Sequence, residues 1–172
     1  MPVFNLVVEK MAVKNLPDDG NLLLDPPLPE LSRVLLRRLI CTMRMPPSPL
    51  LKVVIDTGAP LTVFPHHVWH DQFGWRAGRD YDELPVAGIG ALLTGQVLNY
   101  RYSFTLARLR VPVELAGRDR ERMRIEGLVC QLAGAGGPPF VLLGLVGGVI
   151  AGRRLVVEEQ PNSDDLHARL EF

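Results

Sequence analysis

Apolar and polar residues alternate most regularly between residues 97 and 113. The residues of one face are apolar and those of the other mostly polar, namely Tyr100, Tyr102, Phe104 and Leu106 against Arg101, Ser103, Thr105 and Ala107. A period of two with one apolar face is typical of a strand in an antiparallel sheet. This stretch is the clearest strand prediction in the chain.

Shorter apolar runs predict further strands, with residues 3–8 as an edge strand and others at 50–55, 125–132, 140–144 and 155–157. Residues 34–45 allow two interpretations. Leu31, Leu35 and Leu39 have helical spacing, whereas residues 38–45 alternate as in a strand with one buried face. We favour a strand at the later end, which would form a hairpin with the strand at 50–55.

Three segments predict short helices. Pro65 suits a first helical turn. Residues 145–154 form a second candidate, although Gly147 and Gly148 weaken it by about 1 kcal/mol each relative to alanine. Ser163, before two aspartates, could cap a small C-terminal helix that runs to Leu170.

Length and composition narrow the classes of function. A chain of 172 residues suits one domain with room for an extension, and its hydrophobic content of 47% predicts a real core. The formal net charge of zero gives no reason to expect nucleic acid as a partner. The uncharged segment 140–152 is shorter than the roughly 20 residues that a membrane-spanning helix needs, so no membrane association is expected.

The two cysteines, Cys41 and Cys130, form neither a disulfide framework nor a metal-binding spacing. We expect buried thiols in a reducing compartment. The N-terminal sequence, which starts with Met1 to Phe4, lacks a basic region followed by a long apolar stretch, so we expect no secretory signal. We therefore predict a cytoplasmic protein.

His66 and His70 lie four residues apart and would share a helix face, which is a metal-like spacing. Zinc sites usually need three or four ligands, and the sequence shows no third ligand of matched geometry. We therefore expect no metal at this position and no cofactor elsewhere.

The stretch from Val53 to Val63 carries the most distinctive chemistry. An apolar run leads into Asp56, Thr57, Gly58 and Ala59, and a second apolar run follows. Asp and Gly also favour ordinary turns, so the triplet alone is ambiguous. A carboxylate at the end of a buried strand is costly unless it is hydrogen-bonded, which favours a strand that delivers one acid to a turn at the edge of a core.

In chain order, the Asp-Thr-Gly-Ala loop precedes the tip formed by Gly88, Ile89 and Gly90 and the later run Leu142-Leu143-Gly144. This order resembles the retropepsin-like aspartic proteases over roughly residues 38–158. The resemblance implies an all-β fold, a small closed or partly open β-barrel with one or two short helices. It implies a protease domain at 34–158, an N-terminal extension at 1–33 and a tail at 159–172.

By the same resemblance, Asp56 is the catalytic acid, Thr57 hydrogen-bonds to its dimer mate, and Gly58 presents backbone to the substrate. Ile89, between its two glycines, closes over the substrate as a flap, and Leu142, Leu143 and Gly144 pack beside the catalytic loop. Many viral members carry a paired acid and arginine where this chain has Pro60 and Leu145. The loss of both partners leaves no charge unpaired but weakens the analogy to the viral dimer.

One Asp-Thr-Gly per chain implies a homodimer, because the chemistry needs two carboxylates. The expected partners are a second copy of the chain and a peptide or protein substrate. Two alternatives remain open, a catalytically inactive binding module on the same fold and an unrelated small β protein with an acidic turn.

Overall fold

The computed structural model describes residues 2–12, 35–44, 50–84, 92–97, 100–134, 140–145, 152–162 and 165–172. Within these ranges the fold is all-β, and the helical structure is one short π-helical turn, η4. The elements are β1 (Val3–Ala12), β2 (Leu35–Arg44), β3 (Leu51–Ile55), β4 (Val63–Phe64), η4 (His67–Gln72), β5 (Tyr81–Glu83), β6 (Leu92–Val97), β7 (Tyr100–Leu109), β8 (Val113–Ala116), β9 (Arg122–Ile125), β10 (Leu128–Ala133), β11 (Val141–Leu143), β12 (Arg154–Glu159) and β13 (Leu166–Glu171).

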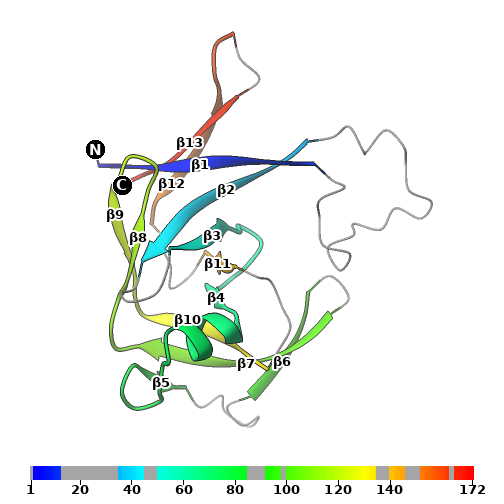
Figure 1. Ribbon diagram of the computed structural model, residues 1–172, viewed down its shortest axis with the longest axis vertical. Helices are drawn as coiled ribbons and strands as arrows, with labels where there is room; N and C mark the ends of the chain where they lie inside the picture. Colours follow the sequence, from blue (N-terminus) through cyan, green and yellow to red (C-terminus); the bar gives the residue numbers. More distant parts are fainter. Residues whose placement is uncertain are drawn as a thin grey trace, which may run out of the picture.

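The strands pair in the order β12-β13-β1-β2-β3-β11-β4-β10-β7-β5, while β6 joins β7 and β8 joins β2 and β9. The pairings of the described residues do not close this sheet into a ring. In Figure 1, β12 and β13 lie at one end and β5, β6 and β7 at the other, with β3, β11 and β4 between them. The acidic loop therefore sits in the middle of the sheet.

The core comes from the inward faces of these strands. Its largest fully buried side chains include Phe4, Leu6, Met43, Phe64, Leu115, Ile125, Leu143 and Leu170. Burying side chains of this size contributes roughly 1.5–3 kcal/mol each relative to exposure. Members of the core come from both ends of the sequence, so β1 and β13 share one core with the central strands.

Several strand predictions are confirmed. Residues 35–44 form a strand rather than a helix, and β2 pairs antiparallel with β3 as a hairpin, with Cys41 opposite Val53. β7 is the long alternating strand, and it pairs with β5, β6 and β10. The predicted strand at 125–132 is divided, because Ile125 ends β9 and the chain turns before β10 begins at Leu128.

The prediction of an edge strand at residues 3–8 is wrong. β1 is an internal strand, whose first residues pair with β13 and whose later residues pair with β2. Phe4 and Leu6 are buried in the core. Residues 3–12, within the proposed N-terminal extension, are therefore part of the sheet, and residues 13–34 lie outside the described ranges.

The predicted C-terminal helix is also wrong, because Leu166–Glu171 forms strand β13 between β12 and β1. Leu170 and Ala168 alternate inward and are fully buried. The period of two across an apolar face outweighs the capping residues that suggested a helix. The helix predicted at 145–154 falls mostly outside the described residues, and Arg154 already begins β12.

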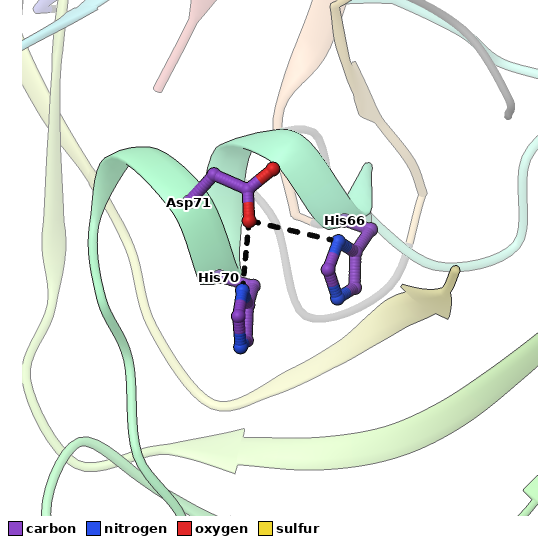
Figure 2. Close-up of side chains that lie close together, drawn as sticks. All are labelled: His66, His70 and Asp71. Atoms are coloured by element: carbon purple, nitrogen blue, oxygen red, sulfur yellow. Dashed lines mark hydrogen bonds and ion pairs between the residues drawn. The ribbon is translucent and has the colours of Figure 1, made fainter. Parts of the chain in front are cut away.

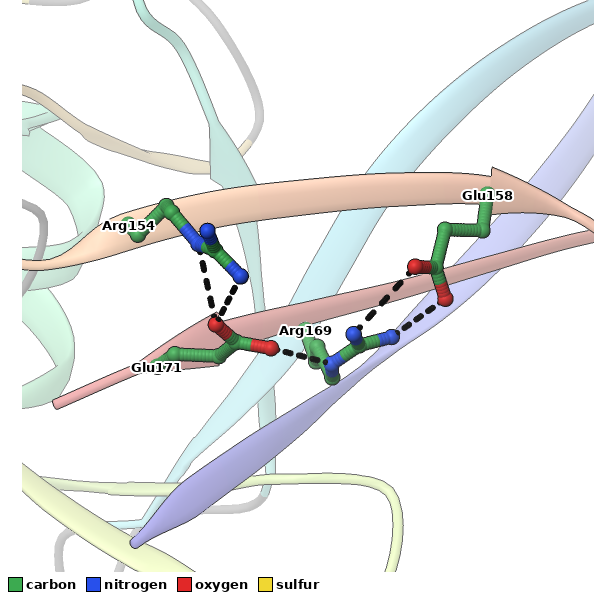
Figure 3. A network of polar contacts seen from close by, with 4 residues as sticks. All are labelled: Arg154, Glu158, Arg169 and Glu171. Carbon is green, nitrogen blue, oxygen red and sulfur yellow. Dashed lines mark hydrogen bonds and ion pairs between the residues drawn. The ribbon is translucent and has the colours of Figure 1, made fainter. Parts of the chain in front are cut away.

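On the outward face, a network of ion pairs ties β12 to β13 (Figure 3). The Arg169 guanidinium lies 2.6 Å from Glu158 and 2.8 Å from Glu171. Arg154 lies 2.6 Å from the other Glu171 oxygen. Glu171 is thus held between two arginines, and Arg169 bridges the two glutamates. No helix among the described residues has the length and apolar character needed to cross a membrane.

Candidate active site

Strand β3 positions Asp56 at its carboxyl end. Val53 is fully buried and Val54 nearly so, which anchors the strand in the core. Asp56 follows directly and is half-buried. Its backbone N–H donates to the Leu143 carbonyl at 3.0 Å, which ties the loop to β11 at the residue that carries the acid.

Hydrogen bonds within the loop fix its shape. The Gly58 N–H donates to Asp56 Oδ1 at 2.9 Å, and the Ala59 N–H donates to the Asp56 carbonyl at 3.2 Å. A carboxylate that accepts a backbone N–H is held in one orientation. Thr57 and Gly58 themselves are exposed, so the tip of the loop faces outward.

Strand β11 lies between the two strands that flank this loop. It runs parallel to β3, with Leu143 beside Ile55, and antiparallel to β4, with Leu142 opposite Val63. The loop from Asp56 to Thr62 therefore passes across the end of β11. The Leu145 N–H donates to the Ala59 carbonyl at 2.9 Å, which completes the attachment.

Gly144 and Thr62 allow the Asp56 loop to lie against the segment that follows β11. A Cβ on Gly144 would lie 2.3 Å from the backbone of Leu61, so only glycine fits there. Thr62 is fully buried, and its Oγ1 accepts the Gly144 N–H at 3.2 Å. Thr62 was not among the predicted site residues, although a hydroxyl within an apolar run signals a buried group that needs a partner.

The structure brings together the two segments that the resemblance named. Residues Asp56 to Ala59 lie beside Leu142, Leu143 and Gly144. The predicted flap, Gly88, Ile89 and Gly90, lies outside the described residues. Pro60 and Leu145 are both exposed, so apolar residues stand at the two surface positions that the resemblance assigns to a charge pair.

The chemistry available at this loop is that of one carboxylate. Asp56 can accept or donate a proton toward a water or a substrate, but one carboxylate cannot serve as acid and base at once. Cysteine chemistry is not an alternative. Burial raises the pKa of the Cys41 and Cys130 thiols to about 12, so both stay protonated and poorly nucleophilic at neutral pH.

The predicted pair His66 and His70 lies at the turn η4 and its N-terminal flank, close to Trp69. Their rings stack with centroids 4.5 Å apart. Asp71 was not among the predicted site residues. Its carboxylate lies close to both imidazoles, with the ligand atoms of all three side chains within 4.8 Å of one another.

Comparison with known proteins identifies no family for this chain. No family model, curated protein or solved structure matches the chain at a significant level.

Proposed function

We propose that this chain is an aspartic endopeptidase that acts as a homodimer, with one Asp56 from each copy. One observation carries the proposal: β11 is inserted between β3 and β4, and the loop that holds Asp56 is bonded across its end through Leu143 and Leu145. This is the packing that the resemblance to retropepsin-like proteases implies for an apolar-apolar-glycine run beside an Asp-Thr-Gly loop.

The same proposal extends to the fold. The described strands would belong to a small, partly open barrel of the retropepsin type. In support, β2 pairs with β1, β3 and β8, so the sheet branches there and can curl around the core. The free, buried thiols of Cys41 and Cys130 suit the reducing cytoplasm, where we expect the protein to act.

Peptide hydrolysis at this site needs two carboxylates that share one proton and hold one water, as in the aspartic-protease dyad. One Asp56 takes a proton from the water, which attacks the scissile carbonyl. The other Asp56 donates its proton to that carbonyl oxygen. As the tetrahedral intermediate collapses, the first Asp56 passes the proton taken from the water to the leaving amine, and the second regains a proton from the hydroxyl that becomes the new carbonyl. A two-fold axis through the pair would place the same loop on both sides of the substrate.

Replacement of Asp56 by Asn tests the catalytic role. Cleavage of a peptide library by Asp56→Asn should fall to background, because the amide cannot act as base. Asp82→Asn is a matched control, since its exposed carboxylate pairs with Arg110 far from the loop in sequence. Unchanged cleavage by Asp56→Asn would refute the proposal.

The dimer is tested separately. Sedimentation velocity should show a dimer at the concentrations where cleavage occurs, and cleavage per chain should fall on dilution as the dimer dissociates. Mixing wild type with excess Asp56→Asn should suppress activity, because mixed dimers contain one competent carboxylate. Full activity from a monomer would contradict the shared dyad.

A second candidate is a non-catalytic binding module on the same fold. The exposed apolar residues Pro60 and Leu145 favour this binding module, and Leu145 is 41% exposed. An ion pair at these two positions would support the loop. The apolar surface found there is suited to contact with a partner protein. A transition-state analogue of aspartic proteases distinguishes the two. A ligand of the native dyad must raise the melting temperature, whereas a module without a dyad should not respond.

A further inference from the structure

Three side chains with metal-ligating atoms meet on the turn η4. We propose that His66, His70 and Asp71 bind one divalent transition-metal ion of the zinc class. Their candidate ligand atoms all lie within 4.8 Å of one another. Figure 2 shows one oxygen of the Asp71 carboxylate facing both imidazoles, 2.8 Å from His70 Nδ1 and 3.9 Å from His66 Nδ1.

The winding of η4 explains why three ligands converge. On an α-helix, residues four apart share a face, but the fifth lies about 140° around the axis. In a π-helical turn the backbone hydrogen bonds join residues five apart, as the Phe73 N–H to Val68 carbonyl bond does at 3.0 Å. The wider turn places residues i+4 and i+5 on either side of residue i, so His70 and Asp71 both approach His66.

The donor set suits the proposed ion. Imidazole nitrogen and carboxylate oxygen are ligands of Zn²⁺, Co²⁺, Ni²⁺ and Cu²⁺, and are not the all-oxygen set that Ca²⁺ or Mg²⁺ requires. Two ligands on a tetrahedral zinc ion stand roughly 3.4 Å apart, given metal–ligand bonds of about 2.1 Å. The distances from Asp71 to the two histidines lie on either side of this value. The histidine ligand atoms, within 4.8 Å of each other, would have to approach this spacing by side-chain rotation. Three protein ligands leave a fourth position for water.

The surroundings fix the site on one side and leave it open on the other. The Trp69 ring meets His66 and His70 edge-on, with centroids 5.2 and 5.4 Å away. Its indole N–H donates to the Leu132 carbonyl of β10 at 2.9 Å, which anchors the turn to the sheet. The side chains of His70 and Asp71 are 57% and 58% exposed, so an ion can enter from solvent.

Calorimetric titration of the tag-free chain with ZnCl₂ tests the proposal. We expect one equivalent of Zn²⁺ to bind, and His66→Gln, His70→Gln and Asp71→Asn each to weaken binding by at least about tenfold. His67→Gln is the matched control, since His67 lies in the same turn but outside the group. No binding, or equal weakening by His67→Gln, would overturn the site.

A second measurement places the ion. The chain has two tryptophans, so Trp75→Phe leaves Trp69 as the only indole. Cu²⁺ should quench its fluorescence with the same stoichiometry, and His66→Gln should abolish that quenching at low Cu²⁺. Quenching that survives in His66→Gln would place the ion elsewhere. The proposal does not depend on the protease function, so Asp56→Asn should bind Zn²⁺ as wild type does.

Discussion

Gly144 and Leu61 approach so closely that a Cβ on residue 144 would stand 2.3 Å from the carbonyl carbon and oxygen of Leu61. Nonbonded carbon atoms normally stay about 3.5–4.0 Å apart. Neither backbone has room to retreat, because Gly144 follows β11 and Leu61 precedes β4, and these strands pair with each other. The close approach holds the Asp56 loop against the core.

Gly144→Ala should therefore lower the free energy of unfolding by about 2 kcal/mol or more, the range of overpacked cores. Gly58→Ala is an informative contrast, because its added Cβ would meet the Asp56 carboxylate oxygen at 3.2 Å, and a side chain can move. Urea denaturation should show a much smaller loss for Gly58→Ala. Equal losses would mean that the Gly144 contact is not the tighter one.

Thr62→Val should destabilise the protein by about 1–3 kcal/mol, although valine has a similar shape. The change removes the hydroxyl that accepts the Gly144 N–H and leaves this buried donor without that partner. Thr62→Ser keeps the acceptor and should recover most of the loss. Thermal unfolding of the two variants measures the difference, and a Ser variant less stable than Val would contradict the role of the hydroxyl.

Glu121 should make the fold sensitive to acid. Burial raises the pKa of its carboxyl, but hydrogen bonds from backbone N–H groups, including those of Asn5 and Asp119, outweigh burial and hold the pKa below its ordinary value. A lowered folded-state pKa gives stability that is present above the unfolded-state pKa and is lost as the pH falls through the folded-state pKa.

We accordingly expect Glu121→Gln to cost about 1–2 kcal/mol at neutral pH, and the gap to wild type to shrink in acid. Chemical denaturation at a series of pH values measures this. The exposed Glu126 supplies the control, and Glu126→Gln should leave the unfolding free energy nearly unchanged. A gap that stays constant with pH would rule out the titration of Glu121 as its source.

Arg169→Met should raise the pKa of Glu171. The hydrogen bond from Arg169 is the largest influence that lowers this pKa, ahead of the bond from Arg154. The Glu171 side chain is only 10% exposed, so solvent replaces the lost partner poorly. Carboxyl NMR titration should show a larger upward shift in Arg169→Met than in Arg154→Met, and the reverse order would contradict the assignment.

Local pattern was enough to predict β7, whose own residues show the period of two, but not β13, where the same period was overridden by capping residues that suggested a helix. It also found Asp56 at the end of β3, because an apolar run ending in Asp-Thr-Gly is visible in adjacent residues. It could not place β1 inside the sheet, since the partner of Phe4 is Leu170 at the other end of the sequence. Pairing between distant segments leaves no mark within either segment.

Asp71 was missed for a different reason. The search for ligands assumed α-helical spacing, in which the residue after His70 faces away from His66. The backbone bond from Phe73 to Val68 widens the turn and brings Asp71 back. Thr62 was missed because its role depends on the hydrogen bond from the Gly144 N–H, and these two residues are 82 positions apart in the sequence.

The pairing of β1 with β13 affects how the protein is made. Residues 3–6 are translated well before their partners, residues 168–171. At roughly 5–20 residues per second, that strand edge stays without its partner for on the order of ten seconds during translation. An open strand edge is a template for pairing with other chains. This edge of β1 is therefore open to such pairing until β13 emerges, and a chaperone that shields β1 would act in that interval.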